Sequence, residues 1–302
     1  MGSRGLLLAC AGLVLAGCAG TTPTPGMARE DPGALKVVSD TTVAGFGWPE
    51  SVGCDAAHGV LYVSQFGGAK PNPPAKDGLG YISKVGLDGK VIEKRYFDVT
   101  MNKPKGIWIV GTRLWVTDID SLWIFDTATR KGRRIALPGA QFANDVTIWN
   151  GAVYVSDNRT DKLFRVEPSD FLDASVQPKV ETVWSGKGVY PNGLWPATDG
   201  SLLMVGFESP DKHKGIYSMS PDGAVHELSI PIGRLDGLQQ LDDGTLLVTD
   251  WDSGEVFRYG PRREVQVLAK GFKGPADLCM MHDTIYAPDL VKGEVRVIKI
   301  AK

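Results

Sequence analysis

The sequence predicts an all-β domain built from six repeated four-stranded units. Short runs rich in Val, Ile, Leu, Tyr and Trp are separated by Asp-Gly, Asn-Gly and Pro turns, and there is little helical periodicity. Each unit pairs a first strand with a second, and the second strands are residues 59–64, 112–118, 151–157, 200–205, 244–250 and 284–289. A unit of about 40 to 50 residues with four strands is typical of a propeller blade, so we expect a six-bladed β-propeller.

Each unit continues with a third strand and a more polar fourth strand. The third strands are clearest at residues 121–125, 162–166, 215–219 and 255–259, and the fourth at 132–137 and 265–269. The sixth unit stops after its third strand, whereas residues 35–39 precede the first unit as outer strands precede the others. We therefore expect the N-terminal outer strand to complete the last blade and close the ring, which also removes an exposed edge. A solenoid, the competing architecture, would need end caps that the sequence does not show.

Residues 1–17 have the pattern of a secretory signal peptide. A short positive head precedes an apolar segment about a dozen residues long, which is too short to span a membrane. The segment Leu15-Ala16-Gly17-Cys18 resembles the lipobox of bacterial lipoproteins. That resemblance implies cleavage before Cys18 and lipidation of its thiol. The alternative is an ordinary signal peptide in which this cysteine is incidental.

Residues 18–34 are rich in Thr, Pro and Gly, so we expect a flexible tether between the lipid and a domain of residues 35–302. The lipobox resemblance implies a protein anchored in a bacterial cell envelope and facing the periplasm, and Ala19 slightly favours the outer membrane. The formal net charge is −2 and no basic run is present, which argues against nucleic acid as a partner. We expect a monomer that contacts the membrane through its lipid anchor only.

Two cysteines, Cys54 and Cys279, remain in the predicted domain. An oxidising envelope would permit a disulfide between them. Their positions within the repeat differ by one residue, which suggests that their side chains point to opposite faces of their strands. We therefore expect two buried free thiols rather than a disulfide.

One position at the start of each first strand carries mostly polar residues. First strands line the channel of a propeller, so these six residues converge near its axis; they are Glu50, Lys105, Asn144, Asn192, Asp236 and Ala276. Two of these residues carry carboxylates and two carry amides, and all four offer hard oxygen atoms. Ca²⁺ is coordinated by about six to eight such oxygen atoms. Neither Cys nor His shares the column, which disfavours zinc. We expect Ca²⁺, or another divalent cation, on Glu50, Asn144, Asn192 and Asp236.

A hydrogen-bonded polar plug is the alternative to a metal. Asn and Asp are natural turn residues, and Pro191-Asn192-Gly193 predicts a turn at the glycine. The Lys105 ammonium could pair with Glu50 or Asp236 and replace the ion. With a metal present, Lys105 would be held off by its flexible stem or poised for an anionic substrate. A second column closes the second strands, and we expect its members to cap turns: Gln65, Asp118, Asp157, Asp250 and Asp289.

At the column residues the sequence resembles the senescence-marker-protein/gluconolactonase/luciferin-regenerating-enzyme family of six-bladed propellers. The resemblance covers about residues 35–302 and rests on four short motifs: Pro49-Glu50-Ser51, Asn144-Asp145, Pro191-Asn192-Gly193-Leu194 and Asp236-Gly237. It implies that Glu50, Asn192 and Asp236 hold a divalent ion, usually calcium, with Asn144 beside it towards water or substrate. Sugar-lactonase members carry an arginine where this chain has Phe142, so a more apolar ester or lactone is the expected substrate.

These observations lead us to expect a metal-dependent lactone or ester hydrolase, in which the ion polarises the substrate carbonyl. Asp236 is the first candidate for the base that activates water, Glu50 the second and Asp145 a lower-ranked one. We expect substrate to contact Asn144, Lys105, Phe142 and the long insertion at residues 67–80. The alternative is a non-catalytic binding or scaffold propeller whose metal is structural or absent. A strictosidine-synthase-like propeller ranks below both.

Overall fold

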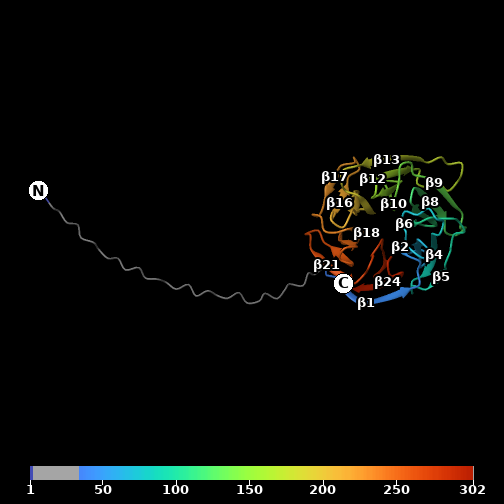
Figure 1. Ribbon diagram of the computed structural model, residues 1–302, viewed down its shortest axis with the longest axis horizontal. Coiled ribbons are helices and arrows are strands. Elements are labelled where there is room, and N and C mark those ends of the chain that lie inside the picture. The colour runs from blue at the N-terminus through green and yellow to red at the C-terminus, as the bar shows by residue number, and fades with distance from the viewer. Residues whose placement is uncertain (3–33, 302) are drawn as a thin grey trace. The chain divides into compact units, whose positions relative to one another are not determined.

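A computed structural model describes residues 1–2 and 34–301 of the chain, and residues 35–302 form one compact unit. The predicted signal peptide, the Cys18 lipidation site and nearly all of the tether lie outside the described residues. The unit consists of six four-stranded antiparallel sheets arranged in a ring, which confirms the predicted six-bladed β-propeller (Figure 1). In the part of the chain that the structure describes, no helix is long and apolar enough to cross a membrane.

The first three blades follow the chain without interruption. Blade 1 consists of β2 (Pro49–Asp55), β3 (Val60–Gln65), β4 (Tyr81–Gly86) and β5 (Val91–Glu93). Blade 2 consists of β6 (Pro104–Val110), β7 (Arg113–Asp118), β8 (Ser121–Asp126) and β9 (Gly132–Ala136). Blade 3 consists of β10 (Ala143–Trp149), β11 (Ala152–Asp157), β12 (Lys162–Glu167) and β13 (Lys179–Ser185).

The last three blades repeat the pattern, and only the sixth combines both ends of the unit. Blade 4 consists of β14 (Pro191–Pro196), β15 (Leu202–Gly206), β16 (Ile216–Met219) and β17 (Val225–Glu227). Blade 5 consists of β18 (Leu235–Gln240), β19 (Leu246–Asp250), β20 (Glu255–Tyr259) and β21 (Val265–Lys270). Blade 6 consists of β22 (Cys279–Met281), β23 (Thr284–Asp289), β24 (Glu294–Ala301) and β1 (Lys36–Ala44).

The ring closes through strand pairing between its two ends, as predicted. Strand β1 runs antiparallel to β24, from Lys36 opposite Ala301 to Ala44 opposite Glu294 (Figure 1). A salt bridge between Arg296 and Asp40 crosses the same pair of strands. The last blade therefore contains both the first and the last strand of the propeller. Because these two strands pair with each other, β24 is not left as an unpaired edge strand.

The hydrophobic core lies between neighbouring blades. One buried cluster combines Leu203 and Val205 of β15 with Leu235 and Leu238 of β18. Another combines blade 2 with blade 3. Each blade therefore buries both faces, one against each neighbour, which explains why the three inner strands are rich in large apolar residues on alternate and adjacent positions.

A β-bulge at the start of the inner strands aims the column residues. In β14 the register jumps between Pro191 and Leu194, so that Asn192 and Gly193 together oppose one residue of β15. The same shift occurs in the inner strands of blades 2, 3 and 5. Bulges redirect side chains and are frequent beside active sites. The predicted turn at Gly193 is wrong, because this glycine lies inside β14.

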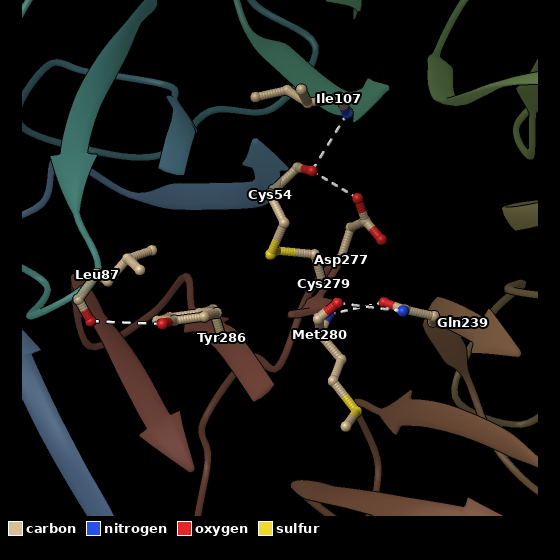
Figure 2. The surroundings of a disulfide bond; sticks show 9 residues. Cys54, Leu87, Ile107, Gln239, Asp277, Cys279, Met280 and Tyr286 are labelled. Carbon is tan, nitrogen blue, oxygen red and sulfur yellow. Dashed lines mark hydrogen bonds between the residues drawn. A yellow bond between two sulfur atoms is a disulfide. The ribbon is translucent and has the colours of Figure 1, made fainter. Parts of the chain in front are cut away.

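A disulfide joins the inner strands of the first and last blades, so the expectation of two free thiols is wrong. Cys54 of β2 and Cys279 of β22 are bonded, with a Cα–Cα distance of 5.9 Å (Figure 2). Their side chains do emerge from opposite faces of their strands. In a ring, however, one face of each blade packs against the opposite face of its neighbour. Side chains on opposite faces of two adjacent blades therefore meet, and the two sulfur atoms come into contact.

We expect the double substitution Cys54→Ser with Cys279→Ser to lower the free energy of unfolding by roughly 2–4 kcal/mol. The bond spans 225 residues, and it restricts the unfolded chain strongly. The loss should be smaller than loop length alone implies, because β1–β24 pairing also closes the ring. Urea denaturation with and without reductant measures it. Reductant should destabilise the parent and leave the variant unchanged; identical curves for all samples would contradict the prediction.

Candidate functional site

The six column residues lie where the inner strands begin, and the structure buries all of them. Glu50, Asn144, Asn192 and Asp236 are at most 5% exposed, and Lys105 is fully buried. Ala276, the sixth member, is also fully buried and adds no polar group. Burying this many polar and ionisable groups is costly unless each finds a partner.

Three of the column side chains contain a buried polar atom without a hydrogen-bond partner. These atoms are Glu50 Oε2, Asn192 Nδ2 and Asp236 Oδ1. The other Asp236 oxygen, Oδ2, accepts a hydrogen bond of 2.9 Å from the indole N–H of Trp251. Trp251 therefore fixes the carboxylate while leaving Oδ1 unused. Unsatisfied polar atoms from three different blades are the feature expected where a cation belongs.

Lys105 does not replace the cation by pairing with a column carboxylate. Its ammonium donates to the backbone carbonyl of Lys103 at 3.3 Å and lies over the ring of Phe142 at 4.1 Å. The ring of Phe66 lies on it as well, at 5.8 Å. No carboxylate of the described residues forms a salt bridge with it. Aromatic faces thus stabilise the charge in place of an ion pair.

A second tier of carboxylates lies one residue further along the inner strands. Asp145 accepts hydrogen bonds from the backbone N–H groups of Val146 and Leu194, at 2.7 and 2.6 Å. Asp277, just before β22 in blade 6, accepts one of 2.5 Å from the Ser51 hydroxyl. Sequence reasoning ranked Asp145 low and missed Asp277. The available signal was position, because both residues directly follow a column member.

The pKa values of these groups follow from burial and mutual repulsion. Burial raises the pKa of Glu50 well above its usual range, and the nearby Asp236 carboxylate adds to the rise. Burial also raises the pKa of Asp236 to about 7 and that of Asp145 to about 7. The pKa of Asp277 is raised by burial and by Asp145. Of these four acidic groups only Glu50 has its raised pKa opposed by a lysine, Lys105.

Burial acts on the one nearby lysine in the opposite direction. It lowers the pKa of Lys105 to about 8, and the carboxylates of Glu50 and Asp118 oppose this decrease. Asn192 approaches Asp236 closely enough to oppose the rise in the Asp236 pKa, although its Nδ2 makes no hydrogen bond of ordinary geometry. One buried ammonium does not neutralise four carboxylates, so the channel keeps an excess of acidic groups.

The second column caps turns after its strands, as predicted for Asp157, Asp250 and Asp289, and it also braces the loops that enter the inner strands. Asp118 accepts from the backbone N–H groups of Asn102 and Lys103, at 2.9 and 2.8 Å, and so fixes the loop that enters β6. Equivalent bonds tie Asp157, Asp250, Asp289 and Gln65 to the entry loops of their own blades. In blade 4 Asp161 takes this role, with bonds to Gly188 and Tyr190. These caps hold the column residues in place.

The insertion at residues 67–80 is an irregular loop between β3 and β4, at the end of the channel where the inner strands begin. The fully buried Lys103 ties it down by donating to Asp77 at 2.7 Å and to the Phe66 carbonyl at 3.0 Å. Phe142, predicted to contact substrate, is half-buried and stacks on Lys105. The structure thus places Phe142 beside Lys105 of the column.

The donor set fits a hard divalent cation. Glu50 and Asp236 supply carboxylate oxygens, and rotating the Asn192 amide by 180° would place its oxygen where Nδ2 now lies. Among the described residues no three His, Cys, Asp or Glu side chains form a ready metal cluster, so amide oxygens would have to complete the shell. Ca²⁺ accepts amide oxygens and water as ligands.

Comparison with solved structures identifies the fold. Virginiamycin B lyase from Staphylococcus aureus is similar with a TM-score of 0.61 and 15% identity, over 89% of this chain and all of that one. A structure described as a putative gluconolactonase has a TM-score of 0.62 and 15% identity, over 87% and 93%. A Bacteroides thetaiotaomicron protein of unknown function has a TM-score of 0.62 and 13% identity, over 88% and 76%.

Comparison of the sequence alone finds no match among protein-family models or curated proteins. At these identities the structural likeness shows the fold. The resemblance to gluconolactonase-like propellers is therefore confirmed at that level, and the chain shares its architecture with propellers that include enzymes.

We expect the stability of the metal-free protein to depend on pH through Asp236. Its pKa is about 7 in the folded chain against an ordinary value of 3.8, so folding favours the protonated form. That contribution is complete below pH 3.8 and is lost as the pH rises to about 7. Relative to the parent, Asp236→Asn should therefore gain unfolding free energy between pH 4 and pH 8, by at most about 4 kcal/mol. Urea denaturation in chelator measures this difference, and a pH-independent difference would contradict it.

Proposed function

We propose that the chain is a metal-dependent hydrolase of a lactone or ester, with the ion held by Glu50, Asn192 and Asp236 and with Asn144 completing or flanking the shell. The observation that supports it is that Glu50, Asn192 and Asp236, from three blades, each bury an unpartnered polar atom, while Asp236 is near enough to both others to influence or be influenced by them electrostatically. A bound divalent ion would polarise a substrate carbonyl and stabilise the oxyanion. The propeller architecture, shared with a structure described as a putative gluconolactonase, agrees with this proposal.

Asp236 is the proposed base that removes a proton from the attacking water. One of its oxygens is fixed by Trp251, and the other, Oδ1, is unused by the protein. Glu50 is the second candidate, because its Oε2 is also unused. Asp145 is a poorer candidate, since both of its oxygens accept backbone N–H groups. A metal-bound carboxylate is a weak base, so the base and the ligand roles compete.

Lys105 and Phe142 are the proposed contacts for the substrate. The ring of Phe142 lies directly on the Lys105 ammonium, so the two form one wall that is apolar on one side and cationic on the other. Such a wall suits a carbonyl compound with an apolar body and a negatively charged or polar group. A second cationic group, the guanidinium of Arg159, also lies over the Phe142 ring at 5.1 Å.

We further propose that the mature protein is anchored through lipid on Cys18 in a bacterial envelope, faces the periplasm and acts as a monomer on a small molecule. The Leu15-Ala16-Gly17-Cys18 segment supports the anchor. The Cys54–Cys279 disulfide agrees with an oxidising compartment.

Calcium is expected to raise the melting temperature of the protein. A ligand at about 100 times its dissociation constant stabilises a folded chain by about 2.7 kcal/mol. Asp236→Ala should abolish the shift, because it removes one of the two carboxylate ligands. Asp283→Ala, which removes an exposed carboxylate outside the column, should keep it. A calcium shift that survives in Asp236→Ala would exclude the proposed site.

Turnover is tested with a panel of γ- and δ-lactones and aryl esters, with and without chelator. We expect hydrolysis of at least one apolar member, lost in chelator and restored by calcium. Asp236→Asn should lower the rate by at least about a hundredfold, since it removes the base and one of the two negatively charged ligands. No turnover on any member, with calcium demonstrably bound, would favour the binding or scaffold propeller instead.

A further inference from the structure

A cavity of about 510 Å³ occupies the channel at the end opposite to the rim loop. All six inner strands contribute to it, and its lining begins one or two residues beyond the column and runs to the turns that follow these strands. Ala56 and His282, which belong to those turns, are exposed at its mouth. The cavity is therefore a separate compartment from the column, reached from the other face. Its volume is in the range of small-molecule sites.

The walls of this cavity are apolar and aromatic. The indoles of Trp108 and Trp195, from blades 2 and 4, lie edge to face with ring centroids 5.2 Å apart. Leucine, isoleucine and methionine side chains and the Cys54–Cys279 disulfide form much of the remaining wall. The indole N–H of Trp108 is buried and has no hydrogen-bond partner among the described residues. The wall thus offers aromatic rings and aliphatic side chains to a ligand.

The ionisable groups that line the cavity are mainly acidic. Asp145 and Asp277 are the two carboxylates in its lining, and both are at most 8% exposed. Neither forms a salt bridge with a lysine or arginine of the described residues, and the lining contains no lysine or arginine. The sole basic group there is the exposed His282 at the mouth. Burial raises the pKa of both groups, and a cation bound beside them at the inner end of the pocket would stabilise their ionised forms.

A bare metal ion fits this compartment poorly. Both Asp145 oxygens already accept backbone N–H groups, and one Asp277 oxygen accepts the Ser51 hydroxyl. A metal would also need several further hard oxygen ligands, whereas the walls supply carbon, sulfur and indole rings. An organic ammonium ion needs fewer ligands, buries its carbon atoms against such walls and interacts favourably with indole faces.

We propose that this cavity binds a small organic ammonium ion, with its charge towards Asp145 and Asp277 and its carbon atoms against Trp108 and Trp195. The site is additional to the metal column and does not depend on the hydrolase proposal.

The test compares choline with 3,3-dimethylbutan-1-ol, in which carbon replaces the quaternary nitrogen, on the full chain by isothermal titration calorimetry in the presence of chelator. We expect choline to bind at least about tenfold more tightly than its neutral isostere, because only choline carries the charge. Binding should persist without divalent metal. Equal affinities, or no detectable binding of choline by the folded protein, would overturn the proposal.

Three variants locate the binding. Asp277→Asn keeps an acceptor for Ser51 and should weaken choline binding by about tenfold or more. Ala56→Trp, an exposed substitution at the mouth, should obstruct entry without disturbing the interior. Asp283→Asn is the matched control, because it removes an exposed carboxylate that does not line this cavity, and it should bind as the parent does. Unchanged affinity in both Asp277→Asn and Ala56→Trp would place any binding elsewhere and overturn the proposal.

Discussion

The structure depends on how closely the inner strands approach one another around the axis. Gly237 shows the constraint: a Cβ there would lie 2.7 Å from the backbone nitrogen of Leu278 in the next blade. At Gly193 a Cβ would collide with the carbonyl oxygen of Asp236, and at Gly106 with Asp145. Backbone hydrogen bonds cross the blades directly, as from Asp277 N to Glu50 O at 3.0 Å. Side chains at the positions just before these glycines are consequently forced together.

That proximity creates an electrostatic problem within the channel. Glu50, Asp145, Asp236 and Asp277 are buried near one another, and burial raises the pKa of each of them. Removing charges from water is expensive, and like charges at close range add to the cost. The single nearby lysine is engaged by Phe142 and by a backbone carbonyl. Such a channel gains stability from any cation that enters it, which is the physical basis of both sites that we propose.

The two ends of the channel offer different groups to a cation. Near the rim, unpartnered oxygens of Glu50 and Asp236 are fixed by bulged strands and by the capping carboxylates of the second column. These rigid hard donors suit a small metal ion. At the opposite end, the walls are indoles, aliphatic side chains and a disulfide, and the acids lie only at the inner end. The acidic residues around the axis therefore border a polar shell at the rim end of the channel and an apolar pocket at the opposite end.

The sequence by itself determined the architecture and most of the column. Repeat spacing and strand periodicity are local properties, so the six blades, the closure by β1 and the equivalent places of Glu50, Asn144, Asn192 and Asp236 at the starts of their inner strands followed from reading the repeats. Only the tertiary structure decided which strand faces meet. Cys54 and Cys279 bond because neighbouring blades oppose their faces, a relation absent from the repeat alignment. Likewise Asp277 and the cavity beside it arise from bulged registers and packing across all six blades, which no single segment encodes.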